Sequence, residues 1–245
     1  MQAPGTTQKV YKIGKTGDCS VVVIKMSPEA IKLARDAMQL AAPQLIQKPP
    51  IRVMGRDCRM PRNVGLFSLP NPETGAPMVP GYRFSGQTVP SMVASGPIGE
   101  LISAINEMFG TNSNAVLVNE YPAGDKSSIG AHSDDEKGLD TSRGVFGINL
   151  YDEIPNGKLS KMVFREKATG EKFEIILEPN TIFGMVGEKF QEQFTHAIPA
   201  AKGAAGRISA TFRSHVEKEA PKHVTGAKRR AEEVPGAEES KRPRA

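Results

Sequence analysis

The 245-residue sequence predicts a mainly β fold with flanking helices (α+β), on three observations. Short candidate strands follow one another between Ala115 and Arg213, separated by turn sequences such as Pro155-Asn156-Gly157. Glycine and proline are frequent and scattered, which favours short strands and turns over a helical bundle. Two amphipathic helical stretches precede this region. Strands at this spacing are typical of an antiparallel sandwich or jelly roll rather than of a parallel βαβ sheet.

The composition is that of one domain with tails. The net charge of +5 permits contacts with phosphates without demonstrating them. Two cysteines, Cys19 and Cys58, cannot build a disulfide framework, and the N-terminus lacks the apolar stretch of a secretory signal, so we expect a reduced, intracellular setting. The apolar runs are too short to span a bilayer, so we expect no membrane partner. We also expect a monomer.

The N-terminal part predicts an arm, a strand and a helix. Residues 1–18 are rich in Gly, Thr and Lys, and we expect a loose, flexible arm. Val21–Lys25 is predicted to be a strand. Ser27 followed by Pro28 is typical of a helix start, and apolar residues at helical spacing extend the predicted helix to Leu40.

The stretch Pro49–Gly96 is dense in proline, which excludes long regular elements, so we expect a loop-rich surface with brief strands. Ile98–Phe109 is predicted to be a second amphipathic helix, with Met108 and Phe109 on its buried side. The strands expected after it are Ala115–Tyr121, Val145–Leu150, Lys161–Arg165, Lys172–Glu178, Thr181–Val186 and Arg207–Arg213.

The C-terminal segment 214–245 has few apolar residues and dense charge, which predicts disorder. Within it, Lys228-Arg229-Arg230 and Lys241-Arg242-Pro243-Arg244 are separated by ten residues. This spacing fits a bipartite signal for a nuclear-import receptor, so we expect the protein in the nucleus. The alternative is a solvated tail whose charges only keep the protein soluble.

Three residues can hold a metal ion. The chain has four histidines, of which His215 and His223 lie at the start of the charged tail. In an extended segment His132 and Asp134 face the same side, and His196 can supply a third ligand. Two imidazoles and one carboxylate are the facial triad of non-haem Fe(II) oxygenases. The alternative is a surface carboxylate cluster beside a turn histidine.

The strand Arg207–Arg213 carries polar residues on one face only, namely Arg207, Ser209, Thr211 and Arg213. Two arginines that point inward from a sheet are costly unless each finds an anion. A dicarboxylate bound to iron would supply that anion, since the planar guanidinium suits carboxylates. The alternative is an edge strand with a wet polar face.

Asn119 and Tyr121 alternate on the strand that precedes the His132 segment, so both face one side. An amide and a phenol beside a metal site can hydrogen-bond a bound keto acid. Without these neighbours, both would be unremarkable residues at the end of a strand.

Together these motifs resemble the AlkB family of Fe(II)- and 2-oxoglutarate-dependent nucleic-acid dioxygenases, and most of all its eukaryotic nuclear DNA-repair members. The resemblance covers roughly Ile51 to Arg213. It is carried by Asn119-x-Tyr121, His132-x-Asp134, His196-Ala197-Ile198-Pro199, Arg207-x5-Arg213, Met60-Pro61-Arg62 and Gly81-Tyr82-Arg83-Phe84-Ser85-Gly86.

The resemblance implies a double-stranded β-helix, a form of jelly roll, within residues 19–213. It implies a nucleotide-recognition lid at about 51–96 and a jelly-roll core at about 115–213. The implied cofactors are Fe(II), the cosubstrate 2-oxoglutarate and O2.

The resemblance also implies roles for the residues already singled out. The implied iron ligands are His132, Asp134 and His196. Arg207 would pair with the distal carboxylate of 2-oxoglutarate. Arg213 would lie at the keto-acid end of 2-oxoglutarate. The residues that would complete the cosubstrate pocket are Asn119, Tyr121 and Ser209.

On the substrate side, Phe84 would stack on the target base and Asp135 would be the acidic residue near it. Tyr82 belongs to the same recognition segment as Phe84. Met54 stands where the family's nuclear members have an aromatic finger that invades duplex DNA, and an apolar wedge can still unstack a base step. The arginines that could contact phosphates are Arg52, Arg56, Arg59 and Arg62, with a solubilising loop as the alternative.

The expected function is oxidative dealkylation of bases such as 1-methyladenine and 3-methylcytosine in DNA. 2-Oxoglutarate would become succinate, and a methyl group would leave as formaldehyde. The alternatives are an RNA demethylase of the same chemistry, a catalytically silent nucleic-acid-binding module, and hydroxylation of a protein side chain.

Overall fold

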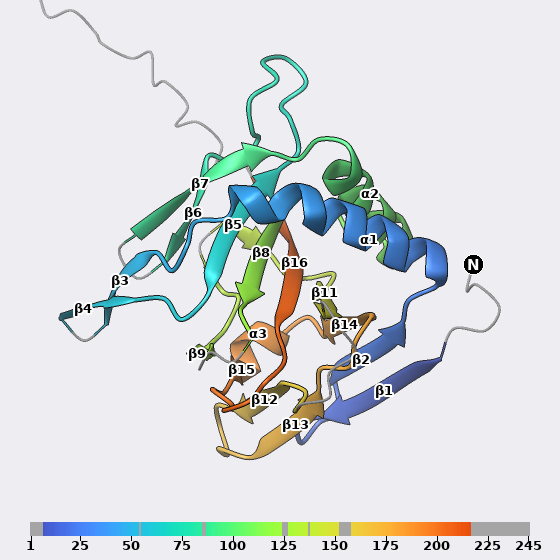
Figure 1. Cartoon of the computed structure of the whole chain (residues 1–245). Helices are drawn as coiled ribbons and strands as arrows, with labels where there is room; N and C mark the ends of the chain where they lie inside the picture. The colour runs from blue at the N-terminus through green and yellow to red at the C-terminus, as the bar shows by residue number, and fades with distance from the viewer. Residues whose placement is uncertain are drawn as a thin grey trace, which may run out of the picture.

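The computed structural model describes residues 7–53, 55–84, 87–123, 127–136, 138–151 and 158–216, and within strands it leaves out the side chains of residues 53, 83, 84 and 87. The helices are α1 (Pro28–Ala41), the short 3-10 helix η1 (Ala42–Gln44), α2 (Pro97–Phe109) and α3 (Phe190–Gln193). Two large helices cover one face of a large sheet, and a smaller sheet faces its other side (Figure 1).

The strands fall into three sheets. In the described part of the chain, the large sheet contains β1 (Gln8–Ile13), β2 (Cys19–Lys25), β5 (Asn63–Ser68), β6 (Gly81–Phe84), β7 (Gln87–Val93), β8 (Ala115–Tyr121), β10 (Leu139–Asp140), β11 (Val145–Tyr151), β14 (Thr181–Val186) and β16 (Arg207–His215). The small sheet contains β9 (Ile129–His132), β12 (Lys161–Glu166), β13 (Lys172–Ile176) and β15 (Phe194–Ile198). The third is the hairpin of β3 (Pro50–Val53) and β4 (Arg56–Arg59).

The sheets have the topology of a jelly roll. The large sheet runs in the order β1-β2-β14-β11-β16-β8-β5-β7-β6, and β10 also pairs with β16. The small sheet runs β13-β12-β15-β9. All described strand pairs are antiparallel except β5 with β7. The predicted fold class, mainly β with flanking helices, is confirmed.

The helices pack on the large sheet through small and aliphatic side chains. Helix α1 begins as predicted, because the Ser27 hydroxyl accepts a hydrogen bond from the backbone N–H of Ala30 and Pro28 occupies the first turn. Helix α2 ends at Gly110, which adopts the left-handed conformation that glycine tolerates best. The prediction that Met108 is buried is wrong, because its side chain is exposed.

Strand β16 lies inside the large sheet and separates two environments. Its residues Ile208, Ala210 and Phe212 face the helices and join their apolar core. The alternate residues face the small sheet, where Arg207 and Arg213 are both buried. The predicted alternation is therefore confirmed, and charged side chains point into the space between the two sheets.

Part of the predicted loose arm is ordered. Residues 8–13 form β1, which pairs along its whole length with β2, so the prediction of a flexible arm is wrong for them. Within the stretch 51–96, where a nucleotide-recognition lid is expected, β5 is fully buried inside the large sheet between β8 and β7. The proline density on both sides of β5 concealed this short strand. The strand pairing of β9 with β15 was not predicted either.

The described residues include no helix long and apolar enough to cross a membrane.

Candidate metal centre and cosubstrate pocket

A cavity of about 630 Å³ lies between the two sheets. The large sheet contributes side chains from β8, β14 and β16, and the small sheet contributes side chains from β9, β12 and β15. Ile51, Met60 and Tyr82 line it from the segments around the β3–β4 hairpin and β6. The volume is in the range of small-molecule sites.

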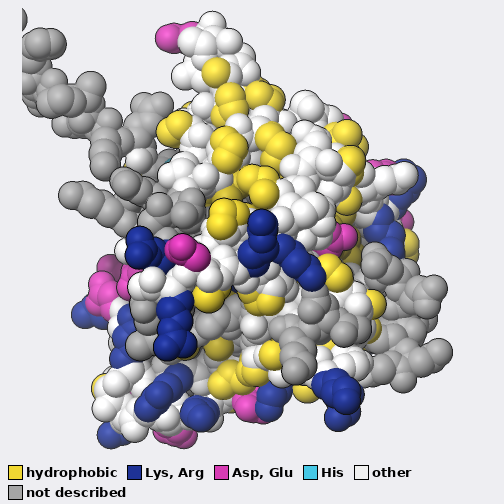
Figure 2. All heavy atoms as spheres, turned by 60° about the vertical axis from the view of Figure 1, so that its left-hand side comes forward, with side chains coloured by type: hydrophobic (Ala, Val, Ile, Leu, Met, Phe, Trp, Pro, Cys, Tyr) yellow, Lys and Arg dark blue, Asp and Glu magenta, His cyan; other side chains and the backbone are white. Residues whose placement is uncertain are grey.

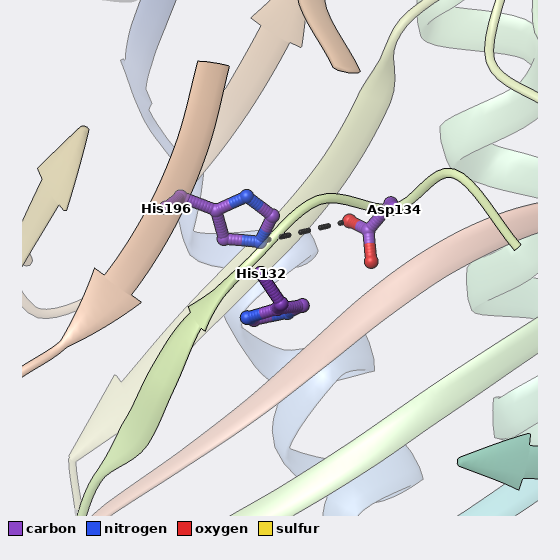
Figure 3. Close-up of side chains that lie close together, drawn as sticks. All are labelled: His132, Asp134 and His196. Carbon is purple, nitrogen blue, oxygen red and sulfur yellow. Dashed lines mark ion pairs between the residues drawn. The ribbon is translucent and has the colours of Figure 1, made fainter. Parts of the chain in front are cut away.

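Three predicted metal ligands meet in this cavity. Strand β9 ends at His132, which stands directly opposite His196 on β15, with the two ring centres 4.2 Å apart. Asp134 follows β9 by two residues and turns its carboxylate toward the same point (Figure 3). One ligand atom from each residue lies within 4.8 Å of the other two. The predicted convergence of residues from two distant stretches is confirmed.

Each of the two imidazoles has one nitrogen that faces the metal site. His132 Nδ1 lies 2.8 Å from the carbonyl oxygen of Gly130, so Nδ1 carries the proton and Nε2 keeps its lone pair. Such a second bond fixes the ring and the tautomer of a ligating histidine. His196 turns Nε2 toward Asp134 Oδ2, at 3.8 Å, and its Nδ1 is buried without a hydrogen-bond partner among the described residues.

Asp134 is buried and held from two sides. Arg213 Nη2 donates to Oδ1 at 2.5 Å, which leaves Oδ2 on the side of the histidines. The backbone N–H of Asp134 donates to the side-chain oxygen of Gln191 on α3, at 2.9 Å. Burial by itself raises the pKa of Asp134, but Arg213 and the two histidines outweigh it and hold the pKa below its usual value. The carboxylate is therefore ionised, as a metal ligand must be.

His196 is suited to remain neutral. Burial lowers its pKa to about 4, since the lowering by desolvation exceeds the raising by Asp134. At neutral pH the site thus presents a neutral buried imidazole and a carboxylate. Together with His132 this donor set fits a divalent iron ion with open positions for further ligands.

Arg207 offers a second anchoring point in the same cavity. Its Nη1 donates to Asn149 Oδ1 at 2.7 Å, and its guanidinium lies 4.2 Å from the centre of the Tyr121 ring. Its Nε and Nη2 are buried and find no hydrogen-bond partner among the described residues. These two groups form one edge of the guanidinium, which is the edge that binds a carboxylate with two parallel bonds. The site therefore fits a carboxylate anion.

The other predicted cosubstrate residues also line the cavity. Asn119 and Tyr121 reach it from β8, and Ser209 and Thr211 reach it from β16. Asn119 and Ser209 are paired across the two strands. Their common orientation follows from the alternation that the sequence predicted.

Arg213 has a different environment from Arg207. Besides Asp134 it contacts Glu136, with Nη1 3.4 Å from Oε1, and its guanidinium lies 4.7 Å from the centre of the Tyr82 ring. Burial alone would lower its pKa, but the two acidic groups and Tyr82 raise it. Arg213 therefore stays charged and ties the loop of Asp134 to β16.

The structure locates two of the four predicted substrate-binding side chains. Tyr82 lines the cavity, and its hydroxyl donates to Glu136 Oε1 at 2.7 Å. Burial, first of all, raises the pKa of Tyr82 to about 12. Asp135 is exposed and lies outside the cavity, 3.8 Å from Lys167 Nζ. Met54 lies outside the described residues, as does the side chain of Phe84, whose backbone belongs to β6.

Asp135 therefore does not line the cavity, and the carboxylate beside Asp134 that does line it belongs to Glu136. The alternation that relates His132 to Asp134 continues to Glu136 and could have identified it. Gln191 and Asn149 were also missed. Both act through contacts with residues 57 or 58 positions away, which no local pattern indicates.

The four arginines expected to contact phosphates differ in position. Arg52, Arg56 and Arg59 are exposed on the β3–β4 hairpin. Arg62 instead turns into the cavity and donates to Asn119. For Arg62, the solvent-facing interpretation is wrong.

Three comparisons with known proteins were made. The sequence profile of the 2OG-Fe(II) oxygenase superfamily matches residues 23–213. The solved structure of OsALKBH1, the rice ALKBH1 protein, is similar with a TM-score of 0.47 and 16% sequence identity, over 80% of this chain and 96% of that chain. A search of curated proteins finds no match.

We predict that His132→Ala greatly weakens metal binding while the fold is retained. His132 is half-buried and its one hydrogen bond stays within β9, so its loss leaves no buried charge unpaired. Loss of one of three ligands should lower Mn²⁺ affinity on the order of 100-fold, since even outer-shell changes cost 10–100-fold. Calorimetric titration with Mn²⁺ measures this. Asp135→Asn is the control, and a His132→Ala protein with unchanged affinity would remove this residue from the ligand set.

A second prediction concerns Arg207→Lys. Lysine keeps the positive charge but lacks the pair of N–H donors, on Nε and Nη2, that Arg207 leaves without a partner among the described residues. Affinity of the Mn²⁺-loaded protein for 2-oxoglutarate should fall roughly tenfold or more, because hydrogen bonds to charged groups contribute about 1.5–3 kcal/mol. Anaerobic calorimetry checks this, with exposed Arg165→Lys as the control. Equal affinity of the Arg207 variant and the parent protein would mean that the strand anchors something else.

Proposed function

The chain belongs to the 2OG-Fe(II) oxygenase superfamily, and from this premise we propose that it removes N-linked alkyl groups from bases in DNA. As an Fe(II)- and 2-oxoglutarate-dependent dioxygenase it uses O2, and His132, Asp134 and His196 form its metal site. The AlkB-like motifs are the source of the substrate proposal.

The bound cofactors supply an oxidation. When bound, iron, 2-oxoglutarate and O2 would supply the hydroxylation of a C–H bond, with one oxygen atom of O2 ending in succinate as CO2 is lost and the other in the new hydroxyl group. On an N-methyl group the product would be N–CH2OH. Its C–N bond breaks, the base recovers its N–H, and the carbon leaves as formaldehyde.

The residues of the chain provide binding and orientation. The unpaired edge of Arg207 would hold the distal carboxylate of 2-oxoglutarate. Ser209, Asn119 and Tyr121 lie on the same wall of the cavity and would complete the contacts. Arg213, which holds Asp134 Oδ1, would also face the keto-acid end.

The observation that carries the proposal is the combination of groups in one cavity. Beside the metal ligands stand the Tyr82 ring and the carboxylate of Glu136, whose Oε2 is buried without a partner among the described residues. An aromatic ring suits a flat base, and a free carboxylate oxygen suits the exocyclic amine of adenine or cytosine. A base must leave the helical stack to reach such an enclosed site.

The surface beside the cavity supports a nucleic-acid substrate. Arg52, Arg56 and Arg59 are exposed on the β3–β4 hairpin, and Ile51 of the same hairpin lines the cavity. In Figure 2, which brings this side of the molecule forward, Lys and Arg side chains spread over the lower half of the face and apolar side chains gather above them. Cations in this position suit a phosphate backbone.

The proposal predicts turnover of methylated DNA. The protein with Fe(II) and 2-oxoglutarate should release formaldehyde from oligonucleotides that contain 1-methyladenine or 3-methylcytosine. Single- and double-stranded DNA and RNA are compared side by side, with His132→Ala as the inactive control. Turnover of RNA alone would replace DNA by RNA as the substrate. Absence of both formaldehyde and substrate-stimulated succinate would favour a silent binding module.

We also propose that the protein acts in the nucleus, on the strength of the two basic clusters at residues 228–230 and 241–244. Both lie outside the described residues. A fluorescent fusion should accumulate in nuclei and lose this distribution when the first cluster is changed to alanine. An even distribution of the unchanged fusion between cytoplasm and nucleus would contradict the proposal.

A further inference from the structure

Arg62 occupies an unexpected position between the hairpin and the large sheet. It follows β4 by three residues and precedes β5, so the sequence placed it with the surface arginines. Its side chain instead lines the cavity, and burial lowers its pKa from the value of a free guanidinium. A cation that is withdrawn from water needs compensating hydrogen bonds.

Arg62 makes two such bonds to different elements. Its Nε donates to Asn119 Oδ1 on β8 at 2.7 Å. Its Nη1 donates to the backbone carbonyl of Ser128 at 3.1 Å, one residue before β9, the strand that carries His132. One guanidinium therefore joins the cosubstrate wall to the start of the metal-binding strand.

The chemistry of arginine also decides which way the amide of Asn119 points. An amide group looks almost symmetric in shape, and its oxygen and nitrogen are told apart by their partners. A guanidinium has donors and no acceptor, so only the oxygen of Asn119 can face Arg62 favourably. The NH2 group must then point away from Arg62.

This orientation matters because of what else lies on that wall. Asn119 is buried, and it pairs across β8 and β16 with Ser209. Two residues farther along β16 in the N-terminal direction, Arg207 presents its unpaired edge to the same cavity. An NH2 group in this environment is a donor for an anion, whereas a flipped amide would present an oxygen that repels it.

We propose that Arg62 is a positioning residue for the cosubstrate, which acts by locking the amide of Asn119 with its NH2 group toward the carboxylate of 2-oxoglutarate. The inference rests on the proposed function to the extent that Asn119 belongs to the cosubstrate pocket. It assigns Arg62 to the binding of 2-oxoglutarate, and not to phosphate contact.

The test uses Arg62→Met, which removes the donors and keeps an unbranched side chain of similar length. 2-Oxoglutarate is titrated anaerobically into the Mn²⁺-loaded protein, so that no turnover occurs. We expect affinity for 2-oxoglutarate to fall about tenfold, in line with the loss of a charge-assisted hydrogen bond. Mn²⁺ affinity without 2-oxoglutarate should stay unchanged. Arg56→Met, an exposed arginine of the same segment, is the matched control and should bind 2-oxoglutarate normally.

A double-mutant cycle separates action through Asn119 from an independent effect. Asn119→Ala alone should weaken 2-oxoglutarate binding, and adding Arg62→Met should weaken it by no more than about twofold further. A full tenfold loss in the Asn119→Ala background would overturn the proposal. Arg62→Lys is the second variant if Arg62→Met does not fold. It retains one donor, so its loss should be smaller than tenfold but measurable, and an affinity equal to that of the parent protein would also overturn the proposal.

If Arg62 instead contacted nucleic acid directly, the binding measurements would differ. Binding of a fluorescent methylated oligonucleotide should be unaffected by Arg62→Met, whereas a phosphate contact would weaken it and leave 2-oxoglutarate affinity intact. That second pattern would overturn the proposal. 2-Oxoglutarate binding is measured without nucleic acid, so a failed demethylation assay would not change the measured effect of Arg62→Met. Failure of the proposed function and failure of the role proposed for Arg62 are therefore distinguishable.

Discussion

The buried ion pair between Arg213 and Asp134 connects the metal site to the fold. Arg213 lies on β16, inside the large sheet, and Asp134 lies in the segment that leaves the small sheet after β9. Two charges withdrawn from water are tolerated only when they are paired and hydrogen-bonded. Arg213 has a second anion in Glu136, and the backbone N–H of Asp134 donates to Gln191, which holds the segment in place. The pair therefore keeps the carboxylate ionised and places one of its oxygens beside the histidines, at the junction of the two sheets.

Strand β16 allows this arrangement because its two faces meet different surroundings. One face is apolar and packs under helices α1 and α2, which fixes the strand in the sheet. The other face presents Arg207, Ser209 and Arg213 to the cavity. An anion is needed at each arginine, and only Arg213 has its anion within the described chain. The unpaired edge of Arg207 is thus the group that would bind the carboxylate of a ligand.

Several features of the site were predictable because they depend on local alternation. The shared face of Arg207 and Arg213, and that of Asn119 and Tyr121, follow from the period of two along a strand. Asp135 was named on a family resemblance, whereas the alternation along the chain points to Glu136, two residues beyond Asp134, and Glu136 is the residue that lines the cavity. The burial of β5 inside the large sheet was not predicted, because short strands between prolines have too few residues to show a period.

The sequence by itself determined the residue types of the site and the faces of the strands that carry them, because side-chain direction along a strand depends only on position. The tertiary structure alone decided that His132 stands opposite His196, that Arg62 turns inward, and that Gln191 supports Asp134. These contacts join residues 57 or more positions apart. Their geometry depends on how two sheets pack, and that packing is set by the whole core and not by any local pattern.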